Sequence, residues 1–207
     1  MISALHFYYC PLLFFMTRFQ HLFPITLAAQ WHPKADQLLA PSLSNWLFDP
    51  TSLTSRLKSH CTKFRVEVIG QQIENCHAEE AKGSIRANEE VLIREVILYC
   101  DELPQVFARS LLPLKSLTGE QQQLANLGTQ PLGQVLFNDP KLERQSIEVA
   151  CFNQQSTVGQ FCHQLNLTYT HNLWGRRSLF ILNNKPIMVS EVFLPQAFAY
   201  QHGVNSL

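Results

Sequence analysis

The stretch Val91-Leu-Ile-Arg-Glu-Val-Ile-Leu-Tyr99 carries the clearest structural signal in the chain. It is dominated by β-branched and large apolar side chains, which predict a strand. Asp101-Glu102 follows as a tight turn, and Val106-Phe-Ala-Arg-Ser-Leu-Leu112 is typical of the returning strand of a hairpin. This part of the chain therefore predicts an antiparallel sheet.

Other strand-like segments occur at residues 64–69, 146–152, 178–182 and 186–194. The first alternates apolar and polar side chains, as a half-buried strand does, and the last two flank an Asn-Asn turn. With the hairpin they make about six strands, mostly joined by short turns. We predict an α+β fold in which flanking helices cover an antiparallel sheet of about six strands.

Short helices are expected on both sides of the central hairpin, and their boundaries rest on residues that favour helix ends. The expected helices are 42–48, 51–58 with Thr51 or Ser52 as its cap, 118–127 ending at Gly128, and one that has Thr129 as its cap and Pro131 in its first turn.

The length of 207 residues and a hydrophobic content of 46% suit one domain. We predict an N-terminal extension at 1–40 and a single domain at 41–207. The Gln/Asn-rich segment 153–172 is interpreted as a polar insertion that loops outward.

The amino terminus is uncharged up to Thr17. Arg18 follows the apolar run, whereas a signal peptide has its positive charge first, and the run is too short for a membrane span. Met16 is an alternative start, which would make residues 1–15 upstream sequence. We therefore predict a cytoplasmic protein without a membrane span.

Composition narrows the function classes. Sixteen Lys and Arg balance sixteen Asp and Glu, which argues against a protein that holds nucleic acid through its phosphates. The six cysteines are irregularly spaced without a Cys-x-x-Cys motif, so we expect reduced thiols. Cys162-His163 with His171 hints at a metal site, but no second cysteine pair stands at ligand spacing, and we predict no metal or other cofactor.

Phosphate-loop, dinucleotide, zinc-protease and serine-hydrolase motifs are absent from the sequence. The remaining candidates for a functional site are two charged residues on apolar strand faces, Arg94 and Glu191. A charge there is costly unless it is paired or meets a ligand. One interpretation pairs the two with each other or with neighbours such as Glu95 or Arg109. The other is a partly apolar pocket for a small anionic ring compound that bears a hydroxyl.

Trp174-Gly-Arg-Arg177 is the other concentrated feature. A basic doublet beside a tryptophan is typical of a solvated turn, and the alternative is that it attracts a second anionic group. Leu53 and Leu132, taken alone, have the ordinary interpretation of core residues.

Several motifs stand in a recognisable order: Ser44-Asn-Trp-Leu, Ser52-Leu-Thr, Glu90-Val-Leu-Ile-Arg-Glu, Leu127-Gly-Thr-Gln-Pro-Leu-Gly, Leu173-Trp-Gly-Arg-Arg-Ser and Ser190-Glu-Val-Phe-Leu-Pro. With them, from about residue 46 to 200, the chain resembles the bacterial chorismate pyruvate-lyase family of ubiquinone biosynthesis. The resemblance implies a cofactor-free enzyme that splits chorismate into 4-hydroxybenzoate and pyruvate. It also implies a six-stranded antiparallel sheet and an internal cavity, covered by helical flaps, that releases its product slowly.

By the family pattern, Arg94 grips the ring carboxylate and Glu191 meets the 4-hydroxyl. Main-chain groups of Leu53 and Leu132 on the flaps close the site, although the family often has Met at the first of these positions. The second carboxylate of chorismate needs its own cation, for which Arg176, Arg177 and Lys141 are candidates.

An alternative interpretation is a binding protein of the same fold that is not an enzyme. The same fold serves as the non-catalytic effector-binding domain of some bacterial transcription regulators, which carry a winged helix-turn-helix in front. Residues 1–44 are too short and too broken by proline for that element. We expect a monomer, because no long heptad pattern is present.

Overall fold

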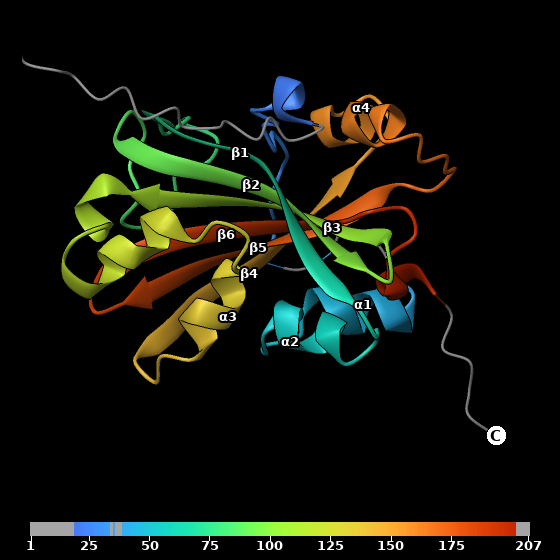
Figure 1. Ribbon diagram of the computed structural model, residues 1–207. Coiled ribbons are helices and arrows are strands. Elements are labelled where there is room, and N and C mark those ends of the chain that lie inside the picture. The colour runs from blue at the N-terminus through green and yellow to red at the C-terminus, as the bar shows by residue number, and fades with distance from the viewer. Residues whose placement is uncertain (1–18, 34, 36–38, 202–207) are drawn as a thin grey trace, which may run out of the picture.

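The computed structural model describes residues 19–33, 35 and 39–201, so the alternative start at Met16 lies outside the described residues. Six strands form one antiparallel sheet in the order β1-β2-β3-β6-β5-β4, which confirms the predicted fold class (Figure 1). The strands are β1 (Phe64–Asn75), β2 (Glu90–Cys100), β3 (Leu103–Pro113), β4 (Leu142–Phe152), β5 (Leu173–Leu182) and β6 (Lys185–Phe193).

The central hairpin forms as predicted. Val96 of β2 pairs with Ala108 of β3, and Asp101 and Glu102 of the turn both have positive φ. The edge strands run further than predicted, to Asn75 in β1 and from Leu142 in β4. Backbone pairing continues there although the side chains no longer alternate, because one side of an edge strand is open to solvent.

Short helices occupy the connections. They are α1 (Pro41–Leu47), α2 (Leu53–Lys58), α3 (Leu132–Phe137) and α4 (Thr157–Gln164), with 3₁₀ turns η1 (Gln20–Leu22), η2 (Leu114–Ser116), η3 (Gly119–Asn126) and η4 (Phe198–Tyr200). Ser52 is the cap of α2, since its Oγ accepts the N–H of Ser55 at 3.4 Å. The expected cap of α3 was wrong: Pro131, rather than Thr129, precedes the first helical residue.

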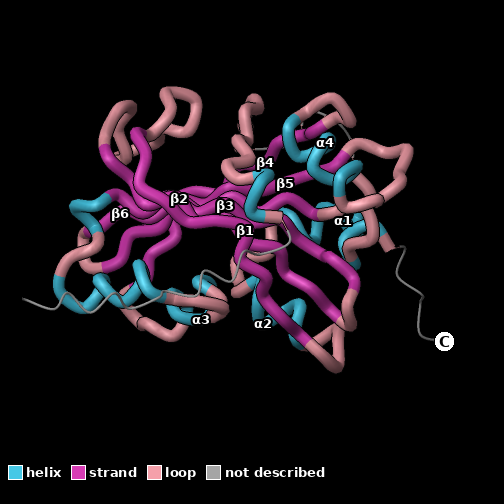
Figure 2. Tube along the Cα trace, turned by 45° about the horizontal axis from the view of Figure 1, so that its top comes forward, coloured by secondary structure: helices cyan, strands magenta, loops and turns pink. Residues whose placement is uncertain are grey.

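Helices cover both faces of the sheet. Figure 1 shows α1, α2 and α3 beneath it and α4 on the other side, and in Figure 2 α2 and α3 lie side by side. We call the side of α1, α2 and α3 the pocket face. Because side chains alternate along a strand, Arg94, Ala108, Arg176 and Glu191 all lie on this face.

Residues 153–172 do not loop outward, which corrects the prediction for this segment. Ser156 caps α4 by accepting the N–H of Gly159 at 3.1 Å. Val158, Phe161 and Cys162 are buried against the sheet. Their i, i+3, i+4 spacing is that of one helix face, but the surrounding Gln and Asn residues conceal it in the sequence.

Trp174-Gly-Arg-Arg177 is not a solvated turn either. All four residues are buried and belong to β5. Gly175 is required there, because a Cβ at this position would stand 3.0 Å from the carbonyl oxygen of Glu191.

The segment before α1 packs on the sheet. Phe19, Ile25 and Leu27 are buried in the same core as α4, the Ile25 N–H donates to the Glu95 carboxylate at 2.9 Å, and His32 pairs with Val149. The domain boundary near residue 41 stays a prediction. Within the described ranges, every helix is too short or too polar to cross a bilayer.

Candidate functional site

A largely enclosed cavity of about 30 Å³ lies between the pocket face and the two covering helices α2 and α3. Arg94 and Glu191 line it from the sheet, and Leu132 and Thr54 line it from the helices. Ligand sites are usually some ten times larger, roughly 300 Å³ or more. A ring compound therefore enters only if α2 and α3 move away from the sheet.

Arg94 is the charge at one end of this cavity. Its side chain is only 2% exposed, and its Nη2 donates to the carbonyl oxygens of Gly128 at 2.9 Å and Gln130 at 3.1 Å. No described residue supplies an acceptor to its Nε and Nη1. Burial lowers the pKa of Arg94 to about 10, because a cation out of water and without a counter-ion is destabilised. Two buried donors of a cation without partners suit an anionic ligand such as a carboxylate.

Glu191 lies at the other end, and it pairs with Arg176. The two residues are partners across β6 and β5, and Arg176 Nε donates to Glu191 Oε2 at 2.7 Å. The interpretation that Arg94 pairs with Glu191 or with a neighbouring carboxylate is therefore wrong. Arg109 and Glu95 do pair, at 2.5 Å, but on the opposite face of the sheet.

The spacing of Arg94 and Glu191 follows from the register. Arg94 pairs with Ser110, which pairs with Val189, two residues before Glu191. Strand spacing and rise then place the two Cα atoms about 12 Å apart. Both side chains lie on the pocket face and line the same cavity. Once α2 and α3 have moved away, the two side chains can therefore contact opposite ends of one small ring compound.

The predicted flap residues each begin a helix. Leu132 is the first residue of α3 and lines the cavity, whereas Leu53, first in α2, is buried but is not among the lining residues. An N–H at this helical position has no partner within its helix. A Cβ on Gly133 would stand 3.1 Å from Thr54 Oγ1, so the starts of α2 and α3 nearly touch above the cavity.

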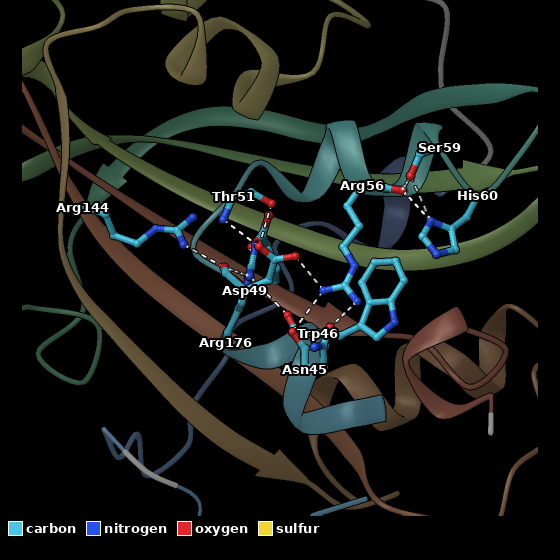
Figure 3. Close-up of polar contacts among 10 residues, drawn as sticks. Asn45, Trp46, Asp49, Thr51, Arg56, Ser59, His60, Arg144 and Arg176 are labelled. Carbon is cyan, nitrogen blue, oxygen red and sulfur yellow. Dashed lines mark hydrogen bonds and ion pairs between the residues drawn. The ribbon is translucent and has the colours of Figure 1, made fainter. Parts of the chain in front are cut away.

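The candidates for a second cation separate clearly. Arg177 faces the other side of the sheet and donates to Glu148 at 2.8 Å, and Lys141 is exposed. Arg176 lies on the pocket face, and its Nη1 donates to the Asp49 carbonyl at 2.8 Å (Figure 3). Arg144 donates to the same carbonyl at 3.0 Å. Arg144 was not among the predicted candidates, because the strand that carries it was predicted to begin two residues later.

A larger, open groove of about 820 Å³ lies elsewhere, beside His171, Trp174 and Tyr200. Its described lining includes no Arg, Lys, Asp or Glu, so no permanently charged side chain there would pair with an anion. We therefore place the candidate site at the smaller cavity, where the buried charges are.

Metal ligands do not gather anywhere in the part of the chain that the structure describes: no group of three His, Cys, Asp or Glu side chains there could hold an ion. The five described cysteines are free thiols.

Comparison with known proteins gives a consistent picture. The sequence model of a family described as chorismate lyase matches residues 26–203. A probable chorismate pyruvate-lyase of Psychromonas ingrahamii is 46% identical over 77% of this chain and 86% of its own length. A probable chorismate pyruvate-lyase of Pseudoalteromonas translucida is 41% identical over 86% of this chain and 98% of its own length.

Among solved structures, the C-terminal domain of a histidine utilization repressor from Pseudomonas syringae superposes with a TM-score of 0.50. It is 11% identical, over 68% of this chain and 97% of that one. At this identity the likeness concerns the fold alone.

Proposed function

Since this chain belongs to the chorismate lyase family, we propose that it is the enzyme that converts chorismate to 4-hydroxybenzoate and pyruvate. The observation that carries the proposal is the cavity with unpartnered Arg94 donors at one end and Glu191 at the other. An aromatic acid with a hydroxyl opposite its carboxylate matches that polarity.

The reaction is an elimination that leaves an aromatic ring. The bond between C3 of the ring and the enolpyruvyl oxygen breaks, and its electron pair leaves with that oxygen. The hydrogen on C4 departs as a proton, and its bonding pair completes the ring. The released enolpyruvate takes up a proton at its CH₂ carbon to become pyruvate. Aromatisation supplies the driving force, so the protein has to orient the substrate and stabilise the departing group.

Arg94 is the proposed anchor of the ring carboxylate. Its Nε and Nη1 are available to a ligand, while Nη2 is held by Gly128 and Gln130 just before α3. Charge-assisted hydrogen bonds of this kind contribute about 1.5–3 kcal/mol each. Because the same side chain touches both the ligand and the segment that leads into α3, ligand binding also favours closure of that flap.

Glu191 is the proposed partner of the C4 hydroxyl. Arg176 occupies its Oε2, which leaves Oε1 to accept a hydrogen bond from the substrate. We propose Leu132 and Leu53 as the residues whose main chains close the cavity from above.

The closed cavity also supports slow product release and inhibition by product, since 4-hydroxybenzoate leaves only when the flaps open. We further propose that the enzyme needs no cofactor, acts as a cytoplasmic monomer, and supplies 4-hydroxybenzoate to ubiquinone biosynthesis.

The test is to incubate the purified protein with chorismate, with and without EDTA, and to follow both products in the same sample. Equal amounts of 4-hydroxybenzoate and pyruvate, unaffected by EDTA, are expected. Arg94→Ala should lose most turnover, and Arg86→Gln, in an exposed part of the loop between β1 and β2, should keep it. Tight binding of 4-hydroxybenzoate without turnover would refute the lyase and leave a non-catalytic effector-binding domain.

A further inference from the structure

We propose that Arg144, together with Arg176, binds the enolpyruvyl carboxylate of chorismate. The inference rests on the proposed function and adds to it a second anion subsite. It identifies the cation that the second carboxylate of the substrate requires.

The order of the charges across the sheet matches the order of the groups on the substrate. Arg94 lies on β2, Glu191 on β6, Arg176 on β5 and Arg144 on β4, all on the pocket face. In chorismate the ring carboxylate is on C1, the hydroxyl on C4 and the enolpyruvyl ether on C3, next to the hydroxyl. With the carboxylate at Arg94 and the hydroxyl at Glu191, the enolpyruvyl group starts beside Glu191 and extends to the strands beyond it.

Contacts on several sides hold the Arg144 side chain in place, and one of its hydrogen-bond donors remains without a partner among the described residues. Its guanidinium carbon lies 4.8 Å from the ring centre of Phe180 and 5.3 Å from that of Phe137 in α3, contacts that fix the plane of the group. Its Nη1 donates to the Asp49 carbonyl, while no described residue accepts a hydrogen bond from its buried Nε. Ser178, on the same face of β5, likewise has a buried Oγ without a partner among the described residues.

The charges around Arg144 carry a net positive charge that an anion could neutralise. Arg144 and Arg176 both donate to the Asp49 carbonyl oxygen, so the two guanidinium groups are neighbours (Figure 3). Glu191 neutralises Arg176, and the Asp49 carboxylate is bound to Arg56 at 2.6 Å. Three guanidinium groups therefore face two carboxylates. Burial, followed by the charge of Arg176, lowers the pKa of Arg144 to about 10, and a bound carboxylate would relieve both effects.

This subsite would act on the departing group itself. Negative charge develops on the enolpyruvyl oxygen as its bond to C3 breaks, and the carboxylate of the same fragment remains bound between the two arginines. The cations are already in place before the reaction, so they need no reorganisation when the charge develops.

The experiment compares two unreactive ligands, 4-hydroxybenzoate and 3-(carboxymethoxy)-4-hydroxybenzoate, which differ by the carboxymethoxy group that carries the second carboxylate. Calorimetry would measure both affinities in the wild-type protein and in Arg144→Met, Arg144→Lys and Arg86→Gln. Methionine keeps an apolar contact with the two phenylalanine rings, lysine keeps the charge, and the exposed Arg86 is the matched control.

The wild-type protein should bind the dicarboxylate more tightly than 4-hydroxybenzoate. In Arg144→Met the dicarboxylate affinity and kcat/KM for chorismate should each fall roughly 10- to 100-fold, as expected for one or two charge-assisted hydrogen bonds. The affinity of Arg144→Met for 4-hydroxybenzoate should stay within about threefold of the wild-type value. Arg86→Gln should keep both affinities within the same limit. Arg144→Lys should recover part of the affinity for the dicarboxylate that Arg144→Met loses.

An equal loss of affinity for both ligands in Arg144→Met and Arg144→Lys would show that Arg144 is structural and would overturn the subsite. So would a wild-type protein that does not prefer the dicarboxylate. These affinities do not depend on turnover. Failure of the wild-type protein to convert chorismate would instead refute the proposed function.

Discussion

Replacement of Arg94 by methionine should stabilise the fold while it removes ligand binding. The guanidinium is buried without a counter-ion, and its pKa of about 10 lies well below the ordinary value for arginine. At about 1.36 kcal/mol per pKa unit, the charged side chain costs the folded state roughly 3 kcal/mol. The two hydrogen bonds to Gly128 and Gln130 offset part of this, at about 1 kcal/mol each.

The expected net gain for Arg94→Met is about 1 kcal/mol in the free energy of unfolding at pH 7. For a chain of this size that corresponds to a rise in Tm of about 2–4 °C. Because two charge-assisted hydrogen bonds to the ligand are lost, the affinity for 4-hydroxybenzoate should fall at least about 100-fold. Thermal melts with and without 4-hydroxybenzoate measure both effects, since only a protein that binds the ligand is stabilised by it.

The pH dependence gives an independent check on the same energy. Since the folded pKa is lowered, the cost is fully present below about pH 10 and disappears as the side chain loses its proton in the folded state. The stability difference between Arg94→Met and the wild-type protein should therefore be constant up to about pH 10 and shrink as the pH rises above that value. A variant that melts lower than the wild-type protein and still binds 4-hydroxybenzoate tightly would refute the reasoning.

Three further substitutions test other parts of the site and fold. Glu191→Gln removes the anionic partner of Arg176 and should lower kcat by about 100-fold or more; a steady-state assay showing near-normal turnover would exclude a catalytic role. Gly133→Ala places a Cβ 3.1 Å from Thr54 Oγ1, so the flaps should close less completely and 4-hydroxybenzoate should dissociate several times faster in stopped flow; an unchanged rate would argue against flap-limited release. Phe161→Ala should cost about 3–5 kcal/mol in urea unfolding, because α4 is part of the core, with normal specific activity of the folded protein; a loss below about 1 kcal/mol would contradict that assignment.

The sheet was predictable because its signal is local. Residues 91–112 carry both strands and the turn of a hairpin in one stretch, and strand pairing across a tight turn needs no information from elsewhere in the chain. The segment 153–172 was interpreted wrongly for the opposite reason. Its single buried face comprises a few residues such as Val158 and Phe161, and only packing against the sheet reveals them as core.

For the charged residues, too, one part was predictable from sequence and another part was not. Sequence alone identified Arg94 and Glu191 as costly side chains on apolar strand faces, because alternation within a strand determines the face. Their partners depended on strand order. Only the β3-β6-β5 arrangement places Glu191 beside Arg176 and leaves Arg94 two strands away.

The sequence by itself thus determined the fold class, the two charges of the proposed site and, through its motifs, the resemblance to a family. The tertiary structure decided which charges are neutralised, and it brought Arg144 and Asp49, 95 positions apart, into hydrogen-bond contact beside the site. The physical reason is the distance along the chain over which each property is determined. Strand patterns depend on neighbours along the chain, whereas the charge balance of a buried site depends on residues that meet only when the whole sheet has formed.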